Sequence, residues 1–220
     1  MSDDTSAIPP SPSAEDYARE GDRPLIPNVS EPFALLETWM KEARANEPND
    51  PSAMALATVD ETGMPDVRIV LLRGVGPDGL KFYTNFESTK ARQLLTSRKA
   101  ALCVHWKSLR RQVRVRGRVE RLDDADSDAY FARRTPQSRI SAIASDQSRP
   151  LPDREVFLKR VAELSEIFGD SEDIPRPPNW GGFRVIPSEV EFWQDQAFRM
   201  HDRLRLKREG EGWASTRLYP

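Results

Sequence analysis

Two arginines and a histidine stand close together near the C-terminal end of the chain. Arg199, His201 and Arg203 alternate with other residues, so a β-strand here would place all three side chains on one face. Guanidinium groups offer a rigid fork of donors that suits a phosphate, and they can stack on a flat ring. The pattern indicates a site for a planar anion, and a solvated strand face is an equally good interpretation.

A second group of cationic and hydroxyl side chains lies between residues 68 and 90. Arg68 and Arg73 bracket an apolar strand, and Ser88, Thr89 and Lys90 open a predicted helix. Backbone N–H groups and the helix dipole favour an anion at such a helix start. A phosphate site is one interpretation, but spacing alone favours an ordinary capped helix with a surface lysine.

The most basic stretch of the chain alternates arginine with valine. It contains Arg110, Arg111, Arg114, Arg116, Arg118 and Arg121. This alternation predicts a strand with one core face and one wet face. Nucleic acid is not an expected partner, because interleaved aromatic residues are lacking and 33 Lys plus Arg are balanced by 35 Asp plus Glu.

Cysteine and histidine are too scarce for several other kinds of site. The single cysteine, Cys103, excludes an intrachain disulfide, and two histidines make a zinc site of the Cys/His kind hard to assemble. We expect no metal. No apolar run approaches the ~18 residues of a membrane span, and the N-terminal residues are acidic and rich in proline, unlike a signal peptide. The sequence therefore predicts a cytoplasmic protein with no membrane partner.

The elements that must position these residues are mostly short strands. Strands are expected at 53–59, 66–72, 80–84, 100–106, 112–121, 182–186, 190–193, 200–207 and 213–218, and helices at 33–45, 88–97, 123–133, 138–145 and 153–168. Hairpin spacing without βαβ alternation favours a mainly β fold, an antiparallel barrel with peripheral helices. Residues 1–30, with five prolines, are expected to be a flexible arm before a single domain at 31–220.

One family resemblance covers roughly residues 32–220. The run Glu191-Phe192-Trp193-Gln194, followed after four residues by Arg199-Met200-His201-Asp202-Arg203, resembles the C-terminal signature of pyridoxamine/pyridoxine 5'-phosphate oxidases. Stretches at 50–58, 68–72, 82–85, 111–113, 147–148 and 180–184 agree in the same order. The resemblance implies an FMN-binding split β-barrel with Greek-key-like connections. It also implies a homodimer that holds each FMN between its two subunits.

The resemblance further implies a role for individual residues. FMN would be held by Arg68, Ile69, Val70, Leu71, Tyr83, Thr84, Thr89, Lys90, Gln112, Gln147, Ser148, Trp193 and Arg203. The substrate phosphate would be held by Arg73, Tyr130, Arg134 and Ser138. Arg199 and His201 would lie against the pyridine ring of the substrate as the catalytic pair.

The implied reaction is the oxidation of pyridoxamine or pyridoxine 5'-phosphate to pyridoxal 5'-phosphate, within vitamin B6 synthesis and salvage. Oxygen is the electron acceptor, H2O2 is released, and the amine substrate also yields ammonia. Four positions depart from the family pattern: Arg73 replaces Lys, Thr89 replaces Arg, Thr135-Pro136 replaces Pro-Arg, and Asp146 replaces Lys. A flavin reductase or oxidase with another substrate, and a non-enzymatic carrier of FMN or pyridoxal phosphate, are the alternatives.

Overall fold

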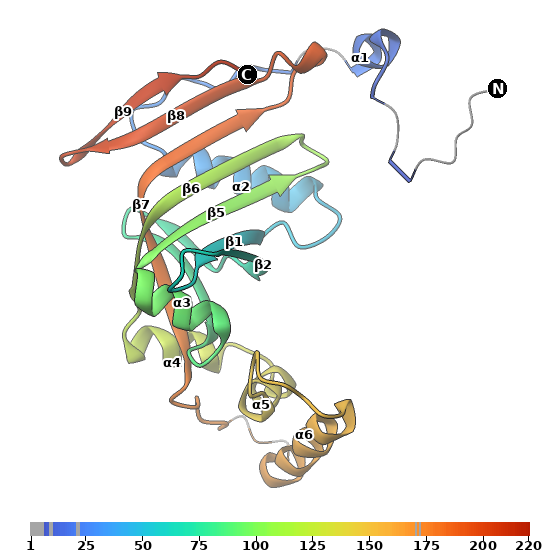
Figure 1. The fold of residues 1–220 in the computed structure, drawn as a ribbon, viewed down its shortest axis with the longest axis vertical. Coiled ribbons are helices and arrows are strands. Elements are labelled where there is room, and N and C mark those ends of the chain that lie inside the picture. The colour runs from blue at the N-terminus through green and yellow to red at the C-terminus, as the bar shows by residue number, and fades with distance from the viewer. Residues whose placement is uncertain (1–6, 9–10, 21–22, 170, 172) are drawn as a thin grey trace.

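The computed structural model describes residues 7–8, 11–20, 23–169, 171 and 173–220. Its strands are β1 Ala53–Val59, β2 Pro65–Leu71, β3 Gly74–Gly76, β4 Gly79–Asn85, β5 Lys99–Trp106, β6 Arg111–Arg121, β7 Trp180–Gln194, β8 Asp202–Glu209 and β9 Gly212–Arg217. All nine belong to one sheet with the order β2-β1-β5-β6-β7-β4-β3, and β8 and β9 extend it from β7 (Figure 1). Every pairing is antiparallel.

The expected class, mainly β with peripheral helices, is confirmed, although the sheet is not closed into a barrel. The helices are α1 Ala14–Glu20, α2 Phe33–Asn46, α3 Thr89–Ser97, α4 Asp124–Ala132, α5 Pro136–Ala144 and α6 Arg154–Phe168, with a 3-10 turn η1 at Ala197–Arg199. Side-chain caps define the starts of four of them: Ser88, Asp123, Thr135 and Asp153 each accept a backbone N–H. Among the described residues, no helix has the length and apolar character needed to cross a membrane.

One long strand replaces two that the sequence suggested. Residues 182–186 and 190–193 both belong to β7, which continues through Pro187 and pairs with β4, β6 and β8. Pro187 lies opposite Gly117, where the register of β6 shifts by a bulge. A Cβ at Gly117 would come 2.1 Å from the Ile186 carbonyl oxygen, so only glycine permits this approach. β7 can therefore connect both ends of the molecule.

Helix α2 covers the sheet through an aromatic cluster. Trp39 is 3% exposed, and its ring meets those of Phe192 and Trp106 edge-on, with centroids 5.2 and 6.4 Å away. Edge-to-face contacts of this kind stabilise a core beyond the area they bury. The helix begins after Pro32, and the Glu31 carboxylate accepts the N–H groups of Phe33 and Ala34 in its first turn.

Some described residues before residue 31, where a flexible arm is expected, contact the domain. Ile26 is 2% exposed, and its N–H donates to Asp202 at 2.7 Å. The aromatic rings of Tyr17 in α1 and Phe198 in η1 lie 5.2 Å apart. Composition gives no signal for these contacts, because they depend on residues that are remote in the sequence, such as Asp202 and Phe198. Residues 1–6, 9–10 and 21–22 of the expected arm lie outside the described residues.

Candidate active site

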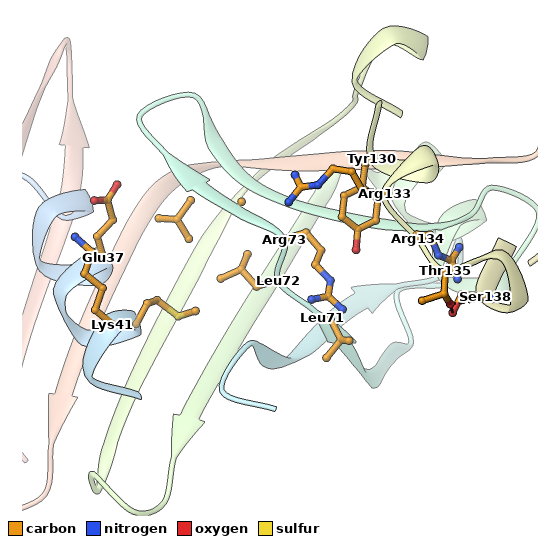
Figure 2. A pocket seen from close by; sticks show the side chains of 13 residues that line it. Glu37, Lys41, Leu71, Leu72, Arg73, Tyr130, Arg133, Arg134, Thr135 and Ser138 are labelled. Atoms are coloured by element: carbon orange, nitrogen blue, oxygen red, sulfur yellow. Dashed lines mark hydrogen bonds between the residues drawn. The ribbon is translucent and has the colours of Figure 1, made fainter. Parts of the chain in front are cut away.

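A cavity of about 900 Å³ lies between α2 and the start of α5 (Figure 2). All four residues predicted to hold the substrate phosphate line it: Arg73, Tyr130, Arg134 and Ser138. They come from distant parts of the sequence, with Arg73 just after β2, Tyr130 in α4, and Arg134 and Ser138 around the start of α5. The fold thus brings this predicted group together.

Local structure explains how the chain around residue 134 is held. Thr135 caps α5, and its hydroxyl donates to that of Ser138 at 2.9 Å. The Arg134 guanidinium lies 4.9 Å from the Trp180 ring centroid and 5.7 Å from that of Phe131. Burial lowers the pKa of Arg134, and the nearby charge of Arg73 acts in the same direction. Two guanidinium groups held near one another favour a multiply charged anion.

The cavity contains residues that the sequence did not single out. Arg133 adds a third guanidinium, while Glu37 and Lys41 of α2 line the opposite side (Figure 2). Trp180, 6% exposed, supports Arg134 from behind. Arg133 is adjacent to a predicted residue in the sequence, but nothing in the spacing distinguished it from a surface arginine. Three arginines against one carboxylate make the cavity suited to a phosphate.

A second group of predicted residues meets at the start of α3. The Lys90 ammonium donates to the Gln147 side-chain oxygen at 2.7 Å, to the Ser88 hydroxyl at 3.3 Å and to the Thr84 hydroxyl at 3.4 Å. No carboxylate of the described residues forms an ion pair with it. Burial and, to a smaller extent, the positive charge of Arg68 lower the pKa of Lys90 to about 8, against a weaker opposing effect of Asp66. A partly buried cation with only neutral partners fits a bound phosphate.

Strand β2 connects this group with the cavity. Arg68 donates to the Thr58 hydroxyl at 2.6 Å and pairs with Asp66, whereas Leu71 and the following residues line the cavity. Ile69, between them, is 65% exposed on an edge strand. Of the remaining predicted residues, Thr89 opens α3, Val70 is half-buried in β2, and Ser148 has a φ of 70° in the loop after α5.

The negative charge that Asp146 places beside this group is turned away from it. Its carboxylate accepts from Arg160 of α6 at 2.6 Å, and this hydrogen bond lowers the pKa of Asp146. The departure from the family pattern at this position therefore removes a lysine without directing a carboxylate at Lys90. The hydrogen bond from Lys90 to Gln147 is therefore not disturbed by a neighbouring negative charge.

The third predicted group has a different geometry from the one expected. Arg199 belongs to η1 with a φ of 63°, and β8 begins only at Asp202, so Arg199, His201 and Arg203 do not share one strand face. The prediction was wrong here because the chain makes a tight turn after β7, which strict alternation of residue types cannot reveal. The three remain close in sequence and influence one another electrostatically.

His201 and Arg203 each contact an acidic residue to which the sequence assigned no role. His201 Nδ1 lies 3.0 Å from the Asp195 carboxylate, and its ring packs on Trp193 at 4.6 Å. Arg203 donates twice to Glu191, at 2.8 and 2.9 Å. Burial lowers the pKa of His201, Asp195 raises it, and nearby arginines lower it again. Both acids lie in the C-terminal segment 191–203 that carries the family resemblance, and this position was the only indication in the sequence that they belong to the site.

This third group lies far from the residues around Lys90 within one chain. Thr84 pairs with Gly181 at one end of β7, whereas Trp193, which pairs with Gln112, is near the other end. Trp193 is twelve positions after Gly181, which corresponds to about 40 Å of fully extended strand. Figure 1 shows η1 at one end of the sheet and α3, α4 and α5 toward the other. The structure therefore brings the predicted residues together in separate groups.

The fold and the cavity define a mainly β-sheet protein with a cation-lined cavity suited to an anionic ligand. The described residues contain no cluster of His, Cys, Asp or Glu suited to a metal ion. Residues 40–168 match the family described as pyridoxamine 5'-phosphate oxidase, and residues 180–220 match the pyridoxine 5'-phosphate oxidase C-terminal dimerisation region. The chain belongs to the pyridoxamine 5'-phosphate oxidase family.

Relatives resemble the chain over nearly its whole length. A pyridoxine/pyridoxamine 5'-phosphate oxidase of Hyphomonas neptunium is 65% identical over 98% of this chain and 99% of its own. The enzyme of the same name from Caulobacter vibrioides is 51% identical, with both chains fully covered. Among solved structures, PhzG from Burkholderia lata in complex with tetrahydrophenazine-1-carboxylic acid has a TM-score of 0.82 at 32% identity, covering 87% of this chain and 94% of its own.

Proposed function

We propose that this protein oxidises pyridoxamine 5'-phosphate and pyridoxine 5'-phosphate to pyridoxal 5'-phosphate, with FMN as cofactor and O2 as electron acceptor. H2O2 is released, together with ammonia from the amine substrate, in vitamin B6 synthesis and salvage. The observation that carries the proposal is the cavity in which Arg73, Tyr130, Arg134 and Ser138 converge. The proposal keeps the cytoplasmic location expected from the sequence.

The donor set at the start of α3 fits the phosphate of FMN. Lys90 supplies a cation with neutral hydrogen-bond partners, and the Thr84 and Ser88 hydroxyls stand beside it. Bound FMN would supply the redox chemistry, by accepting a hydride from the C4' carbon of the substrate and passing electrons to O2. The protein's own residues bind and orient: arginines neutralise the substrate phosphate, and Arg199 and His201 contact its ring.

The arrangement of the predicted FMN residues supports a homodimer with FMN at the subunit interface. Lys90 and Trp193 lie too far apart along one chain to contact the same FMN. A dimer resolves this if the segment of one subunit that carries Trp193 and Arg203 faces the start of α3, with Lys90, in the other subunit. The matched dimerisation region includes Trp193 and Arg203. The exposed apolar side chains of Val67 and Ile69 on β2 are also suited to burial in such an interface.

Mixed dimers test the location of FMN. Lys90→Met and Arg203→Gln are each expected to lose FMN as homodimers. After the two variants are unfolded and refolded together, half of the dimers are mixed and carry one site with both changes and one with neither, so about one quarter of wild-type activity and FMN content should return. No recovery above the separately refolded variants would place each site within one chain and reject the interface.

A different substrate is the main alternative, because the related PhzG structure holds a carboxylic acid without phosphate. Three arginines around one cavity favour the phosphorylated substrate. Aerobic turnover of the FMN-saturated protein should yield pyridoxal phosphate and H2O2 in equal amounts over many cycles, and unphosphorylated pyridoxamine should react poorly. If FMN binds but neither product appears, the family assignment holds and the proposed activity fails. Product that stays bound after one turnover would instead indicate a carrier.

A further inference from the structure

One buried carboxylate ties His201 to two other parts of the chain. Asp195 follows β7 directly and is 8% exposed. Its Oδ1 lies 3.0 Å from His201 Nδ1, and its Oδ2 lies 2.7 Å from Arg110 Nε. Arg23 Nη1 is 3.5 Å from the same Oδ2, which is long for a hydrogen bond, so it contributes mainly charge. Oδ1 therefore faces the imidazole of His201, and Oδ2 faces the guanidinium groups of Arg110 and Arg23.

The backbone around Asp195 is held on both sides. The Asp195 N–H donates to the Arg110 carbonyl at 3.0 Å. The next residue, Gln196, accepts from the Arg23 N–H and donates to the Arg23 carbonyl, both at 2.8 Å. These bonds join the N-terminal segment, the β5–β6 turn and the end of β7. The backbone that carries the carboxylate is consequently held by bonds to Arg23 and Arg110.

The contact with Asp195 determines which ring nitrogen of His201 carries the proton. Asp195 Oδ1 lies within ion-pair distance of Nδ1, at 3.0 Å, and an ionised carboxylate only accepts, so this contact favours a proton on Nδ1. The backbone N–H of Gln196 donates a long hydrogen bond to Nδ1, at 3.4 Å, which needs Nδ1 as an acceptor and opposes that arrangement. The shorter contact, with a charged partner, is the stronger one. In the neutral ring Nε2 then has the free lone pair.

We propose that Asp195 is a positioning residue that holds His201 in the Nδ1–H tautomer, so that Nε2 accepts a hydrogen bond from a donor group of the bound substrate. The part that concerns the substrate rests on the proposed function, whereas the tautomer does not. The arrangement is the one by which a buried aspartate orients a catalytic histidine in other enzymes.

The charges facing His201 keep its ring neutral near pH 7. Burial has the largest effect and lowers the pKa of His201, Asp195 raises it, and Arg199, Arg110 and Arg203 lower it. These residues come from four segments: the β7 end, η1, the β5–β6 turn and β8. A neutral ring is required, because a protonated imidazole has no acceptor nitrogen.

Asparagine at position 195 should reverse the tautomer without removing the side chain. Arg110 Nε only donates and lies 2.7 Å from Oδ2, so the amide oxygen of the variant is expected to face Arg110. The amide NH2 then faces His201 Nδ1, which must become the acceptor, and the proton moves to Nε2. Asp202→Asn is the matched control, since Asp202 follows His201 at the start of β8 and its carboxylate binds Arg217 and the Ile26 N–H instead.

Nitrogen NMR of histidine side chains measures the tautomer directly. The chain has two histidines, so a His105→Gln variant assigns both sets of signals in the FMN-bound protein. At a pH where the ring is neutral, the wild type and Asp202→Asn should show Nδ1–H for His201, and Asp195→Asn should show Nε2–H. An Nε2–H wild type, or an unchanged tautomer in Asp195→Asn, would overturn the assignment.

Turnover then tests what the tautomer does. Asp195→Asn should lower kcat/KM by about tenfold or more with FMN content unchanged, as loss of a correctly oriented histidine predicts. A reversed tautomer with full turnover would refute the acceptor role of Nε2. If the wild type itself does not oxidise vitamin B6 phosphates, the proposed function fails while the NMR result still decides the tautomer.

Discussion

The rings of Tyr83 and Tyr130 stack face to face, with centroids 3.9 Å apart and planes inclined by 7°. Tyr83 lies on β4 beside Thr84 of the Lys90 group, and Tyr130 lies on α4 in the wall of the cavity. Trp180 continues the stack at 5.6 Å from Tyr83. The residues predicted to bind FMN and those predicted to bind the substrate phosphate therefore share this stack of aromatic rings. A substitution in the stack should change the binding of both ligands.

Substitutions of Tyr130 should separate its hydroxyl from its ring. Tyr130→Phe keeps the stack and removes one donor, so KM for pyridoxamine 5'-phosphate should rise about 3- to 10-fold with unchanged FMN affinity. Tyr130→Ala also removes the support of Tyr83 and should weaken FMN binding several-fold. Steady-state kinetics and flavin fluorescence titration measure both effects. Equal FMN affinities for the two variants would show that the stack does not support the cofactor site.

Arg134 should act on the substrate phosphate and not on FMN. Arg134→Ala removes a charged donor from the cavity, so KM for pyridoxamine 5'-phosphate should rise about 10- to 100-fold. The reaction with unphosphorylated pyridoxamine, which is already poor, should change little. Arg154→Ala, on the exposed side of α6, is the control for a general loss of positive charge. An equal loss with both substrates would contradict the phosphate assignment.

Trp180 should be needed to hold Arg134 in place. Trp180→Leu removes the ring that lies 4.9 Å from the guanidinium, whereas Trp180→Phe retains an aromatic face. We expect KM to increase for the leucine variant and to recover in part for the phenylalanine variant, with kcat changed less than KM. Identical kinetics of the two variants, at equal melting temperatures, would show that the cation–π contact does not position Arg134.

FMN affinity should depend on pH through Lys90. The pKa of Lys90 is about 8 in the folded protein, below its usual 10.5. As pH rises above about 8 the ammonium loses its proton, so the dissociation constant for FMN phosphate should increase. In the same window the unfolded chain binds more protons than the folded one, and the cofactor-free protein should gain stability with rising pH.

Lys90→Met tests both consequences. FMN should bind about 10- to 100-fold more weakly at pH 7, and both pH dependences should disappear. Lys99→Met, an exposed lysine at the start of β5, should behave like the wild type. Titrations between pH 7 and 10 with thermal unfolding provide the measurement. A pH dependence that persists in Lys90→Met would assign it to another group.

The carboxylate of Asp146 should have little influence on FMN. Because Arg160 binds it, Asp146→Asn is expected to change FMN affinity by less than about twofold. Gln147→Ala, one residue further, removes an acceptor of Lys90 at 2.7 Å and should weaken FMN binding clearly. If Asp146→Asn instead tightened FMN binding about tenfold, its carboxylate would have to face the phosphate in solution.

Local patterns in the sequence were enough to predict most elements. The alternation around Arg114 and Arg116 follows from the two faces of a strand, and Ser88 at the start of α3 caps the helix as its type predicts. Both features depend on neighbours within a few residues, so no knowledge of the rest of the chain is required. The one strand that runs through Pro187 was missed, because its continuity depends on Gly117 in another strand.

The sequence by itself determined the mainly β class, the family resemblance and the set of residue types able to bind two phosphates. Only the tertiary structure decided their grouping: Arg73 with Arg134, Lys90 with Gln147, and His201 with Asp195, each joined by contacts between separate segments. It also decided that Arg199 leaves the strand of Arg203. The physical reason is that residue type and spacing report local backbone periodicity, whereas distances between remote side chains depend on how the sheet and its helices pack.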